Sequence, residues 1–151
     1  MIRHDISHWP LALSLAYGAS SLDDIEKFMS AWSNWLAQGE SFAILRVFLD
    51  IQSTERSAGA GNSTKPWFQD QAPRIREQVI GIATVVPQSE YERINKINAE
   101  KLFGVPARTF LDVHAALLWL QQEIFSPRGL LLPNDDILKN ISLYKAESAE
   151  L

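Results

Sequence analysis

Three short apolar runs and one alternating segment, all of strand length, are separated along the chain by segments whose apolar residues recur at helical spacing. Glycine, proline or small polar residues bound each run. Because a crossover helix returns the chain to the same end of a sheet, this alternation predicts an α/β fold with a central, mostly parallel sheet of four to five strands flanked by helices. The predicted strands are residues 9–17, 42–49, 79–87 and 105–111.

The helical segments between these runs carry recognisable start signals. Ser21 precedes Leu22, and Asp24 follows three places later, which is the pattern of a capping box. Ser89 and Asp112 stand at the corresponding position before two later amphipathic segments. We therefore expect helices to begin directly after these three capping residues.

The two ends of the chain do not fit the repeat. His4 and His8 are four residues apart, which suits a metal only on a helix, and Trp9–Pro10 directly afterwards argues against a helix there. A ragged N-terminus is the preferred interpretation. We expect residues 1–126 to form the α/β domain and residues 127–151 a C-terminal appendage, with a short helix from Asn134 and a frayed end after Lys145.

Composition limits the classes of function. The 151 residues are 46% hydrophobic and 21% charged, as in one ordinary globular domain, and contain no cysteine. The net charge of −4 and the lack of a basic cluster denser than "PRIRE" argue against nucleic acid as a partner. No apolar run is long enough to span a membrane, and no targeting segment is recognisable at the start, so we expect a cytoplasmic protein.

The glycine-rich segment after the second strand, "GAGNSTK", resembles a phosphate-binding loop. In such a loop a lysine precedes the hydroxyl residue, whereas Lys65 follows Ser63 and Thr64, and Pro66 removes one amide. The residue order argues against nucleotide binding and favours a surface loop from Asp50 to Lys65. A helix is then expected from Pro66, kinked or divided at Pro73.

Two charged residues lie in or next to the second predicted strand, Arg46 within it and Asp50 directly after it. Arg46 interrupts an otherwise apolar run, and a buried guanidinium must either meet a carboxylate or open onto a pocket or an interface. Asp50 follows the strand, where ligand sites of open α/β sheets gather, although capping of a turn is the preferred role. One hypothesis for the function of the protein is a weak hydrolase that uses Asp50 and His114.

Familiar catalytic signatures are missing from the sequence, which contains no G-x-S-x-G, H-E-x-x-H or G-x-G-x-x-G motif. We therefore expect no enzymatic activity, no cofactor and no metal. Trp32 and Trp35 are bulky residues of one helix. Core packing is the preferred interpretation, with exposure of one of the two to a partner as the alternative.

Several phrases of the sequence resemble the SpoIIAA-like proteins, relatives of the STAS domain of anti-sigma-factor antagonists. These phrases are "WPLALSLAYG", "LDDIEKFMSAWSNWLAQGESFAILRVFLD", "RIREQVIGIATVVP" and "VPARTFLDVHAALLWL". They cover most of residues 9–120 and exclude the tail. The resemblance implies a compact α/β sandwich without general enzymatic activity.

In the anti-sigma antagonists a serine in an Asp-Ser-Ser-Gly turn is phosphorylated, and the added charge alters docking. The corresponding segment here, "ERSAGAGNSTKP", lacks that turn, so no hydroxyl can be assigned the switch role. Broader SpoIIAA-like members are likened to lipid-carrying domains with an apolar ligand between helices and sheet. The residues that we consider for partner binding or switching are Asp50, Arg46, Ser57, Ser63, Thr64 and Trp67.

Two functions follow as hypotheses. The first is a regulatory or scaffold domain that binds another protein. The second is a carrier of a small apolar, lipid-like ligand in a pocket between helices and sheet. A homodimer through residues 130–144 is a further expectation, because that segment offers apolar surface.

Overall fold

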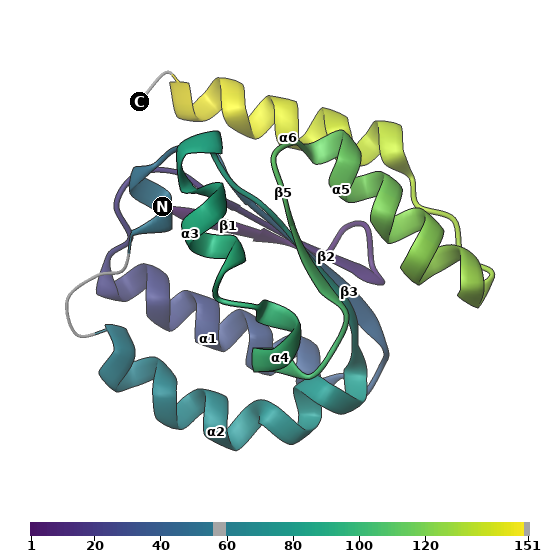
Figure 1. Cartoon of the computed structure of the whole chain (residues 1–151), viewed down its shortest axis with the longest axis horizontal. Helices are drawn as coiled ribbons and strands as arrows, with labels where there is room; N and C mark the ends of the chain where they lie inside the picture. The colour runs from purple at the N-terminus through teal and green to yellow at the C-terminus, as the bar shows by residue number, and fades with distance from the viewer. Residues whose placement is uncertain (56–59, 150–151) are drawn as a thin grey trace.

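A five-stranded sheet forms the centre of the protein in the computed structural model (Figure 1), which describes residues 1–55 and 60–149, the side chains of residues 60–63 excepted. The strands follow one another across the sheet in sequence order. The first pair is antiparallel and the others are parallel, which confirms the predicted mostly parallel sheet. The strands are β1 (Ile2–Asp5), β2 (Leu11–Ala16), β3 (Phe42–Phe48), β4 (Val79–Val85) and β5 (Ala107–Phe110).

The N-terminal segment is an edge strand, so the expectation of a ragged start is wrong. Strand β1 pairs with β2 over four positions, from Ile2 opposite Ala16 to Asp5 opposite Leu13. Its sequence, "IRHD", shows no apolar run because all four side chains are half-buried at the edge of the sheet. The backbone pairing with β2 specifies this strand where the hydrophobic pattern does not.

Helices α1 (Leu22–Ala37), α2 (Ala60–Gln78), α3 (Tyr91–Asn95) and α4 (Ala99–Phe103) connect the parallel strands. Crossovers that step in one direction along a sheet with the same hand place their helices on the same face. In agreement, buried residues of α1, α2 and α4 share one core cluster with Ala12, Ile44 and Ile82 of the strands. We call this side of the sheet the crossover face (Figure 1).

The opposite face is covered by the segments that follow β5. These are α5 (Val113–Trp119), a π-helical segment (Leu120–Phe125), a 3-10 turn (Ser126–Arg128) and α6 (Asn134–Ala149), and Figure 1 shows α5 and α6 on that side. Ile137, Ile141 and Tyr144 of α6 lie in the same core cluster as Leu13 and Leu45 of the strands. The residues predicted as an appendage thus supply part of the core.

Apolar side chains of residues 130–144 are mostly turned inward. Leu132, Ile137 and Ile141 are buried, whereas Leu131 is 87% exposed and Leu143 is 55% exposed. The helix also continues to Ala149, beyond the expected fraying at Lys145. Less apolar surface therefore remains for a homodimer than the sequence suggested, and the dimer stays a prediction.

The segment between β3 and β4 differs from its expected course. A 3-10 turn spans Gln52–Thr54, and α2 begins at Ala60 rather than at Pro66. The prediction of a loop as far as Lys65 is therefore wrong for the residues from Ala60 onward. Helix α2 also continues through Pro73 without being divided.

The capping predictions have mixed outcomes. Ser21 Oγ accepts the amide of Asp24 at 3.1 Å, and the carboxylate of Asp24 accepts the amide of Ser21 at 3.0 Å, so the capping box is confirmed. Asp112 likewise accepts the amide of Ala115 at 2.8 Å. Ser89, in contrast, lies inside a 3-10 turn (Gln88–Glu90), and the expected amphipathic helix after it is divided into α3 and α4.

Tryptophans fill the space between α1 and the crossover face. Trp32 and Trp35 are both buried, which confirms core packing and excludes the exposed alternative. Their rings point to different partners, because Trp32 lies 5.9 Å from the Phe103 ring and Trp35 lies 6.2 Å from the Phe42 ring. One helix face can thus bury both rings.

The packing of α6 gives a first prediction. Ile137→Ala should lower the free energy of unfolding by about 2–5 kcal/mol. The Ile137 side chain of α6 is fully buried against the sheet, so its truncation leaves a cavity. Leu143→Ala, on the exposed side of the same helix, is the matched control and should change stability by less than about 0.5 kcal/mol. Urea unfolding measures both values. Equal, small effects would show that α6 is not part of the core.

Candidate functional site

A cavity of about 320 Å³ lies between the crossover face and helices α1 to α4. Strands β3, β4 and β5 contribute Arg46, Phe48, Thr84 and Thr109 from their carboxyl-terminal halves. Ligand sites in open α/β sheets gather at this end of the strands. The volume falls at the small end of the range for pockets that bind organic ligands.

The walls contributed by the helices are mainly apolar. They include Ile25 and Phe28 of α1, Phe68 of α2, and Leu102 and Phe103 of α4. Ring contacts hold this wall together, since Phe28 lies 6.4 Å from Phe68, and Phe68 lies 5.6 Å from Phe103. The cavity is therefore a preformed aromatic pocket with a polar floor.

The floor belongs to a row of polar side chains that crosses all five strands, and Arg46, Thr84 and Thr109 are the members of this row that line the cavity. The strand register places His4, Ser14, Arg46, Thr84 and Thr109 opposite one another in turn. Each of the predicted buried strands contains one of the last four residues. We call these five residues the polar row; their alignment depends on register, which the sequence pattern did not reveal.

Arg46 stands at the centre of the polar row and opens onto the cavity. Among the described residues no carboxylate forms an ion pair with its guanidinium. The structure therefore decides between the two sequence-based alternatives in favour of a pocket. Burial lowers the pKa of Arg46 to about 10, so the side chain still carries its positive charge at neutral pH.

The guanidinium is held along one edge. Its Nε and Nη2 atoms donate to Thr84 Oγ1 at 3.3 and 3.1 Å, and the group lies 5.9 Å from the centre of the Phe48 ring. Five N–H bonds project from an arginine head group, and these contacts use two of them. The Nη1 side keeps a pair of donors for a ligand.

The side chain of Arg93, which also lines the cavity, already has an ion-pair partner and a hydrogen-bond partner. Its Nε lies 3.6 Å from a carboxylate oxygen of Glu90, and its Nη2 donates to Thr54 Oγ1 at 3.2 Å. Glu55 also lines the cavity, but its side chain is exposed to water. Among the described residues, the charge at the floor of the cavity that no ion pair compensates is therefore that of Arg46.

His4 occupies the far end of the polar row. Its Nδ1 lies 2.8 Å from Ser14 Oγ, its ring meets Trp35 edge-on at 5.7 Å, and its Nε2 is buried without a hydrogen-bond partner among the described residues. Burial lowers the pKa of His4 to about 4, although the charge of Asp24 acts in the opposite direction. The imidazole is neutral at pH 7 and adds no second charge to the row.

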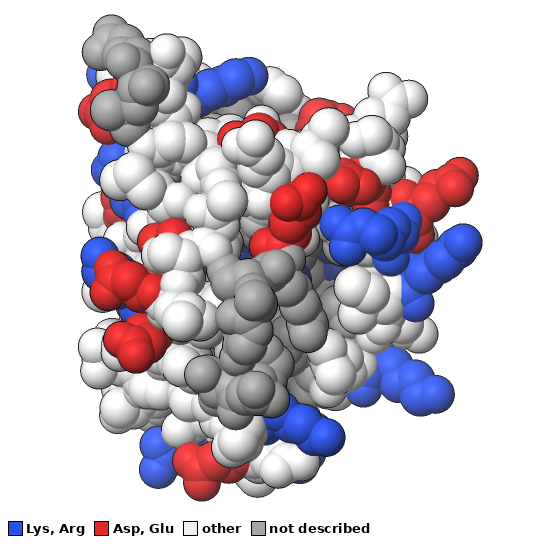
Figure 2. All heavy atoms as spheres, turned by 90° about the vertical axis from the view of Figure 1, so that its left-hand side faces the viewer, with Lys and Arg blue, Asp and Glu red and all other residues white. Residues whose placement is uncertain are grey.

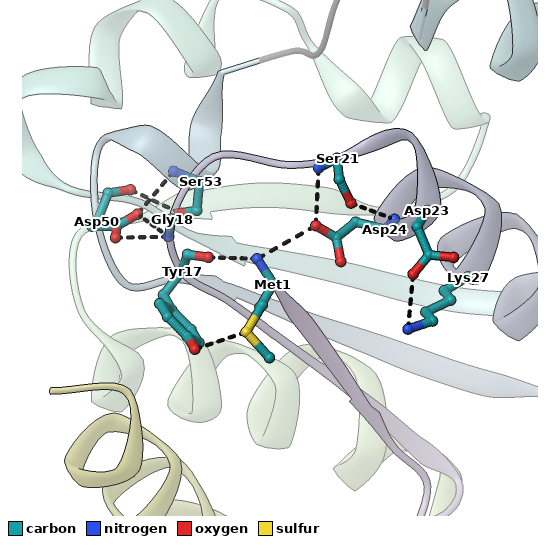
Figure 3. A network of polar contacts seen from close by, with 9 residues as sticks. All are labelled: Met1, Tyr17, Gly18, Ser21, Asp23, Asp24, Lys27, Asp50 and Ser53. Carbon is teal, nitrogen blue, oxygen red and sulfur yellow. Dashed lines mark hydrogen bonds and ion pairs between the residues drawn. The ribbon is translucent and has the colours of Figure 1, made fainter. Parts of the chain in front are cut away.

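Asp50, proposed from sequence as a site residue, ties two turns together (Figure 3). Its carboxylate accepts the amide of Gly18 at 2.8 Å and the amide of Ser53 at 2.8 Å. Partial burial acts to raise the pKa of Asp50, but these hydrogen bonds outweigh it and lower the pKa. The preferred capping role is confirmed, and Asp50 is not among the residues that line the cavity.

The other candidates have separate places. Trp67 packs on α1, with its Nε1 donating to Ser33 Oγ at 2.9 Å, and Thr64 lines the cavity. Ser57 lies outside the described residues, and the side chain of Ser63 does as well. The structure thus brings Arg46 and Thr64 to one cavity and leaves Asp50 and Trp67 outside its lining.

His114 belongs to a different region. It lines a second cavity of about 430 Å³ with Val86, Leu138 and Lys145, whereas the oxygens of Asp50 are occupied by turn amides. The hydrolase alternative therefore has no support from these contacts. Within the described part of the chain, three or more histidine or acidic side chains nowhere gather as metal ligands.

The face of the molecule shown in Figure 2 does not carry charge of one sign alone. Acidic and basic side chains are interspersed on the face shown in Figure 2 rather than separated by sign. In the described residues, none of the helices has the length and apolar character needed to cross a membrane.

The comparisons with known proteins found no relative. No protein-family model matches the chain, and no curated protein or solved structure matches it either. The functional argument therefore depends on the cavity and the polar row.

The burial of His4 predicts a pH dependence. Between its usual pKa of 6.5 and the folded-state value of about 4, the unfolded chain binds a proton that the folded protein does not. Stability is therefore full above pH 6.5 and should fall by up to about 3 kcal/mol as the pH drops to 4. Urea unfolding at several pH values measures this loss.

His4→Gln should remove most of that pH dependence, whereas His114→Gln, at an exposed imidazole, should preserve it. Unchanged pH dependence in His4→Gln would mean that the imidazole is not buried in its neutral form.

Proposed function

We propose that the protein binds a small, mostly apolar molecule in the cavity between α1 to α4 and the crossover face, and acts as a non-enzymatic carrier or ligand-responsive domain. The observation that carries this proposal is the preformed cavity of about 320 Å³ with aromatic walls and a polar floor. Pockets with apolar walls and a few placed polar groups are the usual form of small-molecule sites.

The residue chemistry supports binding rather than catalysis. His114 and Asp50 do not share the cavity, and in the described part of the chain the titratable side chains that line it are Arg46, Arg93 and Glu55. An arginine charged at neutral pH cannot serve as a general base there. The proposal also agrees with the SpoIIAA-like resemblance, whose broader members are likened to lipid-carrying domains.

The regulatory or scaffold role that the sequence placed first remains compatible with this proposal. Its motivation was the lack of catalytic signatures in the sequence together with the apolar C-terminal segment, and Leu132, Ile137 and Ile141 of that segment pack into the core. A ligand that fills the cavity would contact α1, α2 and α4 together. Occupancy could then be communicated to another protein through the outer surfaces of these helices.

Binding of neutral alcohols tests the cavity directly. Affinity for straight-chain alcohols should increase with chain length by about 0.8 kcal/mol per methylene until the cavity is filled, because each methylene leaves water for an apolar wall. Isothermal titration calorimetry on the whole chain measures this series.

Ala99→Phe provides the decisive variant, since Ala99 lines the cavity and the larger side chain would occupy it. Glu100→Phe is the matched control, because it adds the same ring at the exposed neighbouring position of α4. We expect Ala99→Phe to abolish alcohol binding and Glu100→Phe to retain it. Equal affinities in the two variants would place the alcohol elsewhere.

A further inference from the structure

The polar row also indicates the chemistry of the ligand. We propose that the ligand is a small monocarboxylate with an apolar body, whose carboxylate is bound by Arg46 and whose body lies against the aromatic wall. This inference depends on the proposed function, because it assigns a head group to the molecule that the cavity holds.

The first argument is the cost of an unpaired charge. Removing a guanidinium from water without an anionic partner is unfavourable, and such groups are normally paired or open to a binding site. Arg46 lies inside the sheet, donates to the neutral hydroxyl of Thr84, and forms no ion pair with a described residue. A bound anion would supply the missing partner.

The second argument is geometry. Because Nε and Nη2 both donate to Thr84 Oγ1, that hydroxyl fixes the plane of the guanidinium from one side. The opposite Nη1–Nη2 edge then presents two parallel N–H donors. A planar carboxylate accepts such a pair with both oxygens, which is the strong, bidentate arrangement of arginine recognition.

The third argument is the charge of the site. Arg93 is paired with Glu90, the neutral His4 adds no charge, and Glu55 is exposed to water at the rim. Among the described residues, one positive charge, that of Arg46, thus remains at the floor and matches one carboxylate. A phosphate monoester carries about −1.5 to −2 charge at neutral pH and would leave part of it uncompensated among apolar walls.

The apolar wall specifies the rest of the molecule. Phe28, Phe68 and Phe103 line the cavity with Ile25 and Leu102, and these side chains offer no charged group to a ligand. A short alkyl chain or a single ring can lie against them while the carboxylate reaches Arg46. These five side chains offer no hydrogen-bond partner to a second polar head.

The test compares three probes with the same chain, namely octanoate, octan-1-ol and octyl phosphate, by titration calorimetry on the whole chain. The wild-type protein should bind octanoate about 10- to 100-fold more tightly than octan-1-ol, the value of a charged hydrogen-bonded pair. Octyl phosphate should bind more weakly than octanoate.

Variants of Arg46 assign this preference to its guanidinium. Arg46→Gln should lose the preference for octanoate and keep the affinity for octan-1-ol, while Arg46→Lys, which keeps the charge without the fork, should lie between the two. Arg108→Gln is the matched control, because Arg108 is an exposed arginine of β5 outside the cavity lining. It should behave like the wild-type protein.

The outcomes separate the two proposals. If all three probes fail to bind, both the proposed function and this inference are wrong. If octan-1-ol binds as tightly as octanoate, or octyl phosphate binds more tightly, the cavity is a ligand site but the carboxylate assignment is wrong. The wild-type comparison decides this point even if Arg46→Gln does not fold.

Discussion

The crossover face holds one guanidinium, that of Arg46, which forms an ion pair with no carboxylate of the described residues. Arg46 is in register with Ser14 on one side and Thr84 on the other, so its nearest neighbours across the strands are hydroxyls. A charge in that position stays stable only if polar groups or a cavity reach it. The polar row and the cavity between α1 to α4 satisfy this requirement together, which is why Arg46 lies at the candidate site.

The order of the strands explains on which face of the sheet the helices pack. Because the parallel strands follow one another across the sheet, the connecting helices pack on the crossover face. The other face would expose Leu13, Leu45 and Val85 unless later segments covered it, and α5, the π-helical segment and α6 do so. The π-helical segment packs very closely on strand β4 at Gly81. A Cβ at this position would lie 2.9 Å from Ile124 Cδ1, so glycine is needed there. The C-terminal segment is thus required by the topology.

Much of the fold could be predicted from the sequence, and the exceptions have physical causes. Three of the four parallel strands have strong apolar runs, the fourth alternates, and the capping pairs at Ser21 and Asp112 are local, so these signals are visible in one chain. Strand β1 was missed because edge pairing needs no apolar pattern. The role of α6 was missed because a weakly amphipathic helix does not indicate which surface it covers.

Only part of the candidate site could be predicted from the sequence. Arg46 could be singled out because a charged residue interrupts an apolar strand, and this reasoning led correctly to a pocket. Its partners could not be named, since Thr84 and Thr109 are ordinary residues until strand register places them beside it. Asp50 was proposed for its place after a strand, but two turn amides occupy its carboxylate. Which residues line the cavity depends on the long-range register of the strands, and a local sequence pattern does not show that register.

The central claim is that Arg46 receives an anionic ligand inside the cavity. A crystal structure of the whole chain with octanoate tests this most directly. The account predicts a carboxylate within hydrogen-bond distance of Arg46 Nη1 and Nη2, with the alkyl chain beside Phe28, Phe68 and Phe103. Octanoate bound in the second cavity near His114, or an Arg46 guanidinium paired with a carboxylate of the protein itself, would contradict it.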